Sequence, residues 1–292
     1  MHHGHLDGKM INIYTFADKR PDFIELQSKT MKKFIKDEFN LKVFDNSSTP
    51  HLSAEIHRAC EKNEIEVLQT EKNHRTPNHA CWVPINYCLR NHLKDNDDVT
   101  VIIDSDIFMI NDFSFFDYIK DYDIAGVYQQ RKNLEIEYIW NALVVINNKQ
   151  VFKKNLSIDF EPIQPNITDV GGKTSSLTKD PNVKIKWTNH TADISCAESS
   201  KIFSEFDYHQ SFGFQILEKS FLHYYRGSNW DGQAQVYHAK KTECLQKVLD
   251  ASPFTIDDSF AQNFIGERMH SHKHWNGCCN LIVPKQFSKL DK

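Results

Sequence analysis

The chain has 292 residues, of which 40% are hydrophobic and 25% charged, a balance that is ordinary for a globular protein. Its net charge of −4 argues against non-specific binding to nucleic acid, and no apolar run approaches the roughly 20 residues of a transmembrane helix. Seven cysteines without a C-x-x-C pair indicate neither a disulfide framework nor a zinc ribbon, and the two common glycine-rich phosphate-loop motifs are missing from the sequence.

Up to residue 104, short β-branched runs alternate with segments whose apolar residues recur every three or four positions. We expect strands at 10–16, 41–44, 65–68 and 99–103, and helices at 20–35, 52–62 and 79–93. Four strands alternating with three helices predict the α/β class, with a Rossmann-type mixed sheet that is mainly parallel and flanked by helices on both faces.

Beyond residue 106 this alternation breaks down. We expect strands at 123–128, 136–146 and 221–225, and helices at 113–118, 206–219 and 239–249. Residues 155–189 are polar and interrupted by prolines, and a loop of that length in a compact domain is usually functional or mobile. The tail carries a group of histidines and cysteines at 270–279, whose spacing fits no zinc finger and predicts a surface loop.

Three polar residues, Asp104, Ser105 and Asp106, directly follow the apolar run at 99–103. Ligands of open α/β sheets bind at the carboxyl ends of strands. Two carboxylates this close repel each other unless a cation lies between them, and Mg²⁺ or Mn²⁺ held by carboxylates keeps positions open for phosphate. We therefore expect an Asp-Ser-Asp clamp for a metal that holds a diphosphate. The alternative is a solvated acidic turn.

Four motifs, in the same order, resemble those of GT-A fold glycosyltransferases, in particular the glycogenin-like and bacterial lipopolysaccharide enzymes. They are VIIDSD at 101–106, which resembles the metal-binding D-x-D motif, KVFDNSST at 42–49, YIWNALVVINN at 138–148 and HYYRGSNW at 223–230. The resemblance covers residues 10–235. It implies a GT-A-like fold and a metal-dependent transfer of a sugar from a nucleotide-diphosphate sugar, a UDP-sugar first of all, to a glycan or other hydroxyl acceptor.

The resemblance also implies a metal site. Asp106 would bind Mn²⁺ or Mg²⁺ directly, Asp104 would contact the metal or the donor ribose, and His223 would be the third protein ligand. An imidazole ligand suits Mn²⁺ better than Mg²⁺. Taken alone, His223 would be interpreted as a buried histidine at a strand end whose hydrogen bonds are satisfied, and the D-x-D motif is what favours the ligand role.

Other positions would bind the donor. The end of the first strand, where this fold meets the base, supplies Thr15, Phe16 and Ala17, with Arg20 either at the phosphates or as a surface charge. Asp45 ends the second strand, where it would bind base or ribose or else form an Asx turn or helix cap. The clamp's Ser105 and the motif residues Asn141 and Asn229 complete the set, with Asn141 at the donor sugar and Asn229 nearest the family's diphosphate-binding lysine.

The sequence departs from the family pattern at two places. Leu143 stands where the family has glycine, and in the segment at 223–230 the glycine comes one residue late and the Lys-Pro pair is missing. Arg226 would then supply the missing charge. These departures bear mainly on the identity of the substrate, and to a smaller degree on the mechanism.

Asp169 precedes a Gly-Gly pair in the long polar stretch. It is a candidate for an acceptor-side base or a sugar-hydroxyl binder, and a turn residue is the simpler alternative. An inverting reaction needs such a base, whereas a retaining one does not, because the leaving phosphate takes the proton. The segment around His223 resembles retaining enzymes, which favours retention.

Rival functions predict different features. A haloacid-dehalogenase-type phosphatase also uses paired acids, but it places them on its first strand and needs a later acidic pair. A nucleotidyltransferase would need a glycine-rich triphosphate loop near the first strand. A non-catalytic module that binds nucleotide or sugar remains the main alternative.

For the organisation of the chain we expect a leader or expression remnant at 1–9, one catalytic domain at 10–235 and a C-terminal helical or irregular extension at 236–292. Within the catalytic domain, residues 10–110 would form the nucleotide-binding half and 111–235 the acceptor half. We expect a cytoplasmic protein without a transmembrane segment, and the sequence leaves open whether it forms a homo-oligomer.

Overall fold

The computed structural model describes residues 9–69, 77–131, 136–190, 197–227 and 233–256. The leader, Asn229 and the His/Cys-rich tail therefore lie outside the described residues. The chain divides into two compact units, one of residues 1–105 and 113–188 and one of residues 106–112 and 189–292. The sequence predicted other boundaries, with a donor half at 10–110, an acceptor half at 111–235 and an extension at 236–292. Because that division assigns functions to the parts, it stays a prediction.

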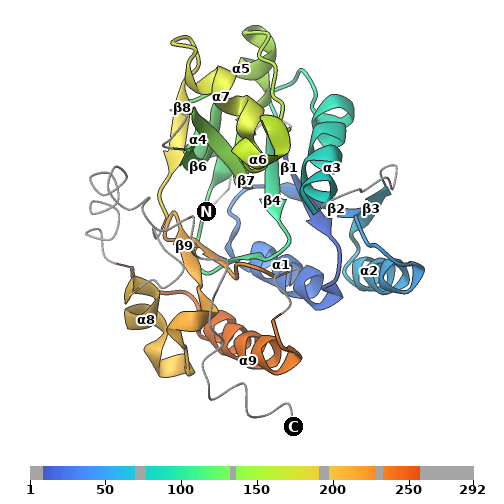
Figure 1. Ribbon diagram of the computed structural model, residues 1–292, viewed down its shortest axis with the longest axis vertical. Coiled ribbons are helices and arrows are strands. Elements are labelled where there is room, and N and C mark those ends of the chain that lie inside the picture. Colours follow the sequence, from blue (N-terminus) through green and yellow to red (C-terminus); the bar gives the residue numbers. More distant parts are fainter. Residues whose placement is uncertain (1–8, 70–76, 132–135, 191–196, 228–232, 257–292) are drawn as a thin grey trace, which may run out of the picture. The chain divides into compact units, whose positions relative to one another are not determined.

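The first unit is built on a seven-stranded sheet with the order β3-β2-β1-β4-β7-β6-β8 (Figure 1). Its strands are β1 (Ile11–Ala17), β2 (Phe39–Asp45), β3 (Glu66–Gln69), β4 (Val99–Asp104), β6 (Ile124–Arg131), β7 (Ile136–Asn147) and β8 (Ile185–Thr188). Within this sheet β7 alone runs antiparallel to its neighbours β4 and β6. The predicted class, a mixed and mainly parallel α/β sheet, is confirmed.

Three helices follow the first strands, as the sequence predicted: α1 (Pro21–Phe34), α2 (Pro50–Lys62) and α3 (Pro77–His92). Proline at the first position suits the starts of α1 and α2, and the Thr49 side chain caps α2 by accepting a hydrogen bond from the Leu52 amide at 3.3 Å. Because neighbouring strand residues point to opposite faces, Ala17 and Val43 pack with α1 and α2, whereas Tyr14 and Phe44 pack with α3.

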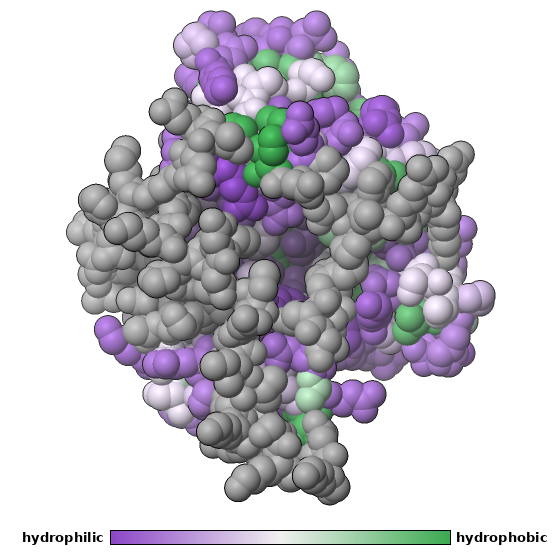
Figure 2. All heavy atoms as spheres, viewed as in Figure 1, coloured by the Kyte–Doolittle hydropathy of each residue, from purple (hydrophilic) through white to green (hydrophobic). Residues whose placement is uncertain are grey.

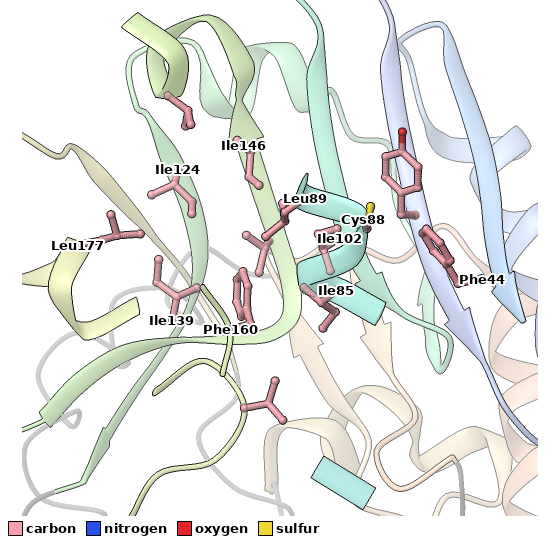
Figure 3. Close-up of a cluster of buried hydrophobic side chains, with 14 residues drawn as sticks. Phe44, Ile85, Cys88, Leu89, Ile102, Ile124, Ile139, Ile146, Phe160 and Leu177 are labelled. Carbon is pink, nitrogen blue, oxygen red and sulfur yellow. The ribbon is translucent and has the colours of Figure 1, made fainter. Parts of the chain in front are cut away.

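A hydrophobic core fills the α3 face of this sheet. Figure 3 shows Ile85, Cys88 and Leu89 of α3 beside Ile102 of β4 and Phe44 of β2. The cluster continues over the other half of the sheet. There it consists of Ile124, Ile139, Val144, Ile146, Val151, Phe160, Val170 and Leu177, all buried. This packing holds the carboxyl ends of β1, β2 and β4 at one edge.

The polar stretch at 155–189 is more ordered than a loop. Besides β8 it holds α6 (Gln164–Ile167), a 3₁₀ turn (Gly172–Thr174) and α7 (Ser175–Thr178), and the unit also contains α4 (Phe115–Ile119) and α5 (Asn148–Lys153). Non-local contacts fix it, for example the Ile139 amide that donates to Thr174 Oγ1 at 2.8 Å. Gly171 has φ +102°, and a Cβ there would lie 2.0 Å from the Ile139 carbonyl oxygen. The glycine therefore lets this segment approach β7.

The second unit has an antiparallel three-stranded sheet with the order β5-β10-β9. Its elements are β5 (Ile107–Met109), α8 (Ala197–Phe203), β9 (Gln215–Leu217), β10 (Phe221–His223) and α9 (Gln235–Ala251). The helix predicted at 206–219 is wrong, because Asp207 and Gly213 take left-handed backbone angles (φ 59° and 66°) that interrupt it. Two 3₁₀ turns, Ser204–Phe206 and Gln210–Phe212, and strand β9 stand in its place.

The surface of the described residues is polar. Figure 2 shows mostly hydrophilic side chains with small separate hydrophobic areas, and Phe152, at 40%, is the one large hydrophobic side chain among the described residues that is exposed. In the part of the chain that the structure describes, no helix combines the length and the apolar character that crossing a membrane would require.

Candidate metal centre

Asp104 is the last residue of β4, and two side chains of the first unit hold it. The Asn141 side-chain amide donates to its Oδ1 at 3.1 Å, and the Gln27 side chain donates to its backbone oxygen at 3.0 Å. Asn141 reaches it because β7 pairs antiparallel with β4, with Leu143 opposite Ile103. The fold thus brings together two residues that the sequence singled out separately.

Asp106 and His223 are brought together by the small sheet of the second unit. Ile107 of β5 pairs with His223 of β10, so the residue before Ile107 lies beside the histidine. Asp106 Oδ1 is 3.3 Å from His223 Nε2, and both residues are buried. The Tyr224 amide also donates to the Asp106 backbone oxygen at 2.8 Å, which closes the pairing.

The other ring nitrogen of His223 is held by Gln215, which lies directly across from it on β9. His223 Nδ1 is 3.0 Å from the Gln215 side-chain oxygen. An amide oxygen only accepts hydrogen bonds, so Nδ1 carries the proton and, in the neutral ring, Nε2 presents a lone pair to the Asp106 carboxylate. Two acceptors face each other at this point. A cation between them, or a second proton on the ring, is required to make the contact favourable.

The segment from Tyr224 to Gly227 wraps around Asp106. The Gly227 amide donates to Asp106 Oδ2 at 2.9 Å. To make this turn, Tyr225 and Arg226 both take left-handed backbone angles, φ 60° and 64°. For residues with a Cβ such angles cost about 1–3 kcal/mol each. Two such residues in succession beside a buried acid mark a segment whose shape is fixed by its surroundings.

The charges around Asp106 favour its carboxylate form. Burial alone would raise the pKa of Asp106. When a second proton on the His223 ring replaces the cation, the charge of His223 and its hydrogen bond, the Gly227 amide and the charge of Lys241 outweigh burial, and together they hold this pKa below its ordinary value. Lys241, on α9, is itself 1% exposed, and its Nζ donates to the Tyr225 backbone oxygen at 2.8 Å.

Asp106 and His223, both of the second unit, can each offer a ligand atom to a cation, and Asp104, at the end of β4, carries a carboxylate that can do the same. Asp104 is two residues before Asp106, so the chain itself keeps their backbones within about 7 Å. Two carboxylates and one imidazole form a donor set that suits Mn²⁺, and a hydrogen bond from the second ring nitrogen to an oxygen is the usual support of a ligating histidine. The residues present fit a divalent cation.

The predicted donor-binding residues of β1 lie at the same sheet edge. Phe16 pairs with Asp104 across β1 and β4, and Ala17 pairs with Asp45 across β1 and β2. Phe16 also stacks on Phe44 with their ring centroids 5.1 Å apart, and Thr15 is fully buried.

Arg20 forms a bidentate ion pair with Asp22, at 2.8 and 2.5 Å, and lies over the Phe23 ring. This is the surface-charge alternative of the sequence analysis. Its role at the phosphates stays a prediction.

Asp45 is buried and forms the Asx turn that the sequence left open. Its Oδ1 accepts from the Ser47 amide at 3.0 Å and from the Ser47 hydroxyl, and its Oδ2 accepts from the Ser53 hydroxyl. A cavity of about 590 Å³ opens beside these residues at the start of α2, lined also by His57 and Arg58. The role of Asp45 in binding the base or the ribose stays a prediction.

Asp169 lies beside β7. Its amide donates to the Tyr138 hydroxyl at 3.3 Å, and its Oδ1 accepts from the Val170 amide at 2.8 Å. Ser105 occupies the turn between β4 and β5. Neither position is tested further by these contacts, and both remain predictions.

Three residues of the site were missed by sequence reasoning: Gln27, Gln215 and Lys241. Gln215 lay inside the predicted helix at 206–219, which hid its pairing with His223. Lys241 left a signal that could have been used, because it shares a helix face with the buried Tyr237, Cys244, Leu245 and Val248. A lysine at a core position of an amphipathic helix is unusual and points to a specific partner.

No protein-family model matches the chain, and no curated protein matches it. Among solved structures it is similar to the mannosyltransferase PcManGT from Pyrobaculum calidifontis in complex with GDP-Man and Mn²⁺, with 14% identity and a TM-score of 0.42 over 61% of this chain and 54% of that one. The chain thus spans about half the length of that enzyme.

It is also similar to the galactosyltransferase LgtC in complex with donor and acceptor sugar analogs, with 11% identity and a TM-score of 0.44 over 85% of this chain and 98% of that one. A third similar structure is glucosyl-3-phosphoglycerate synthase from Mycobacterium tuberculosis in complex with phosphoglyceric acid, with 13% identity and a TM-score of 0.35 over 49% and 59% of the two chains. Each is a partial likeness in fold at low sequence identity.

Proposed function

We propose that this protein is a metal-dependent glycosyltransferase that moves a sugar from a nucleotide-diphosphate sugar to a hydroxyl acceptor. One observation supports this most directly. His223 turns the lone pair of Nε2 towards Asp106 Oδ1 at 3.3 Å while Gln215 holds its other nitrogen. Asp106 itself follows shortly after β4, the strand that ends in Asp104. A cation resolves this contact and leaves coordination positions for a ligand.

The chain's own residues would prepare the site for that cation. Asn141 orients the Asp104 carboxylate, Gln215 orients the imidazole, and Gly227 occupies the second oxygen of Asp106. When bound, Mn²⁺ or Mg²⁺ would supply Lewis-acid stabilisation of the diphosphate leaving group. Because the ligands are held before binding, little reorganisation is needed when charge develops on that group.

The donor would lie along the edge formed by β1, β2 and β4. In this proposal a UDP-sugar places its base near Thr15, Phe16, Ala17 and Asp45, its diphosphate near Arg20, Ser105 and Asn229, and its sugar near Asn141. Asp169 would contact the acceptor hydroxyl. We favour retention of the anomeric configuration, in which the leaving phosphate takes the acceptor's proton. Residues 10–110 would then serve mainly the donor and 111–235 the acceptor.

A thermal-shift experiment tests the proposal. UDP with Mn²⁺ should raise the melting temperature, because a ligand that binds only the folded state stabilises it by mass action. UDP or Mn²⁺ alone should raise it less. The Asp106→Asn variant should lose the combined shift and the Mn²⁺-dependent release of UDP from a UDP-sugar. The matched control is Asp121→Asn, which changes an exposed acid.

The outcomes separate the alternatives. Metal-dependent binding of UDP without turnover of any donor would favour the non-catalytic binding module. Cleavage of a simple aryl phosphate would favour a phosphatase. Full turnover by Asp106→Asn would contradict the proposed role of this acid.

A further inference from the structure

We propose that Lys241 is a positioning residue of the metal centre. It holds the turn at 224–227 in the shape that places the Gly227 amide on Asp106 Oδ2 and so keeps Oδ1 as the metal-binding atom. This inference rests on the proposed function and adds a residue outside the predicted site. All the contacts that carry it lie within the second unit.

The burial of Lys241 requires a reason. Its side chain is 1% exposed, and Nζ lies 4.1 Å from the Tyr224 ring centroid and 5.6 Å from that of Phe214. Lysine is almost never fully buried unless it is paired, because a charge that leaves water must regain its interactions elsewhere. Here the aromatic faces and the Tyr225 carbonyl oxygen, 2.8 Å from Nζ, receive the charge.

The Tyr225 carbonyl is the point at which this lysine acts on the turn. Tyr225 and Arg226 are both left-handed, and the peptide group between them begins with that carbonyl. A charge-assisted hydrogen bond from Nζ fixes the direction of the carbonyl and thereby this peptide plane. If the bond were lost, the peptide could rotate to relieve the left-handed angles, and the Gly227 amide would move with it.

The Gly227 amide in turn distinguishes the two oxygens of Asp106. Oδ2 accepts from Gly227 at 2.9 Å, whereas Oδ1 faces His223 Nε2 at 3.3 Å. With the turn in place, the carboxylate is oriented to bind a cation through one oxygen, on the side of the imidazole. With the turn displaced, the carboxylate can rotate, and the ligand geometry is lost even though Asp106 and His223 are still present.

Mn²⁺ binding to the full-length chain, measured by the loss of the free Mn²⁺ signal in electron paramagnetic resonance, tests this inference. We expect Lys241→Met to weaken Mn²⁺ binding and raise its Kd by about 10- to 100-fold, the usual effect of removing a group that orients a ligand. Lys241→Arg, which keeps a charged donor, should recover part of the affinity. The matched control is Lys240→Met, an exposed lysine of the same helix, and it should bind as the wild type does.

The outcomes distinguish this inference from the proposed function. If the wild type does not bind Mn²⁺, the proposed metal site itself is wrong. If the wild type binds and a folded Lys241→Met binds equally well, the positioning role of Lys241 is wrong and the metal site stands. An effect confined to the melting temperature, with an unchanged Kd, would also overturn it, because it would show a purely structural lysine.

A measurement on the wild type covers the case in which Lys241→Met does not fold. Hydrogen exchange followed by mass spectrometry should show residues 224–227 protected without metal, because the turn is already held. Exchange in this segment as fast as in an unstructured peptide would overturn the inference. Protection here, together with partial recovery of Mn²⁺ binding in Lys241→Arg, would support it.

Discussion

The imidazole of His223 meets the carboxylate of Asp106 at 3.3 Å, with the ring proton already committed to Gln215 on the opposite side. Asp106 lies far from Gln215 and His223 in the sequence. The pairing of β10 with β5 and with β9 brings these three residues together. Their arrangement makes the site dependent on neighbours that bind no ligand themselves, and this dependence can be measured.

Gln215→Leu removes the acceptor for His223 Nδ1. We expect Mn²⁺ affinity to fall about 10- to 100-fold, because the ring loses the bond that sets its orientation and its protonated nitrogen. Direct titration with Mn²⁺ measures the change. Gln246→Leu on α9 changes the same residue type away from the site and should leave the affinity unaltered. Equal affinities for Gln215→Leu and the wild type would contradict the assigned role.

Asn141→Ala removes the amide that donates to Asp104 Oδ1. Turnover of the donor with Mn²⁺ should fall by on the order of 10- to 100-fold, since small displacements of a positioned group cost that much. Release of UDP from a UDP-sugar measures it. The control is Asn91→Ala on α3, an exposed asparagine whose side chain donates to the Tyr87 backbone oxygen. A loss shared by both variants would point to general destabilisation instead.

Gly171→Ala tests the close approach of the 169–174 segment to β7. The new methyl group would lie 2.0 Å from the Ile139 carbonyl oxygen at a left-handed backbone angle. The free energy of unfolding should fall by at least about 2 kcal/mol. Urea unfolding of this variant beside Lys179→Ala, a change at an exposed residue directly after α7, measures the difference. A stability equal to that of the wild type would mean that the segment does not pack on β7 as described.

Cys60 and Cys244 are expected to react slowly in the folded protein. Burial, first of all, raises the pKa of each thiol to about 12. The reactive thiolate should therefore be scarcer by on the order of a thousandfold than in an unfolded chain, where the pKa is about 8.5. Alkylation at pH 8 with peptide mass spectrometry measures this, and rapid labelling before unfolding would contradict it.

The same two thiols imply a dependence of stability on pH. Their folded pKa lies above the unfolded value, so the neutral form favours folding. Their contribution is complete below about pH 8.5 and is lost as the pH rises from there towards 12. The free energy of unfolding should therefore fall over this range. In a variant with both residues changed to alanine the decline should be smaller.

Much of the first unit could be predicted from the sequence because its pattern is local. The β-branched run before Asp104 and the helical spacing around α1 and α3 report directly on burial. The small elements after residue 155 could not be predicted in this way. The 3₁₀ turn Gly172–Thr174 and helix α7 depend on bonds to β7, those of Ile139 to Thr174 and of Thr178 to Glu137, which no local pattern contains.

The site divides along the same line. Asp104 and Asp106 follow a clear strand, and His223 belongs to a motif, so all three could be predicted. Gln215 and Lys241 act through cross-strand pairing and through burial in an aromatic cluster. Those relations arise only once β9, β10 and α9 have packed. The helix wrongly predicted at 206–219 also placed Gln215 in a helix, so its pairing with His223 could not be inferred.

The pairing of Ile107 with His223 has a consequence for how this site can change. Side chains alternate between the two faces of a sheet, so a shift of β10 by a single residue would turn the imidazole to the opposite face. Surface substitutions in the surrounding loops cannot adjust the distance between Asp106 and His223 by small steps. An insertion or deletion inside β5 or β10 should therefore abolish the proposed binding of a metal ion, because it changes the register that brings Asp106 to His223.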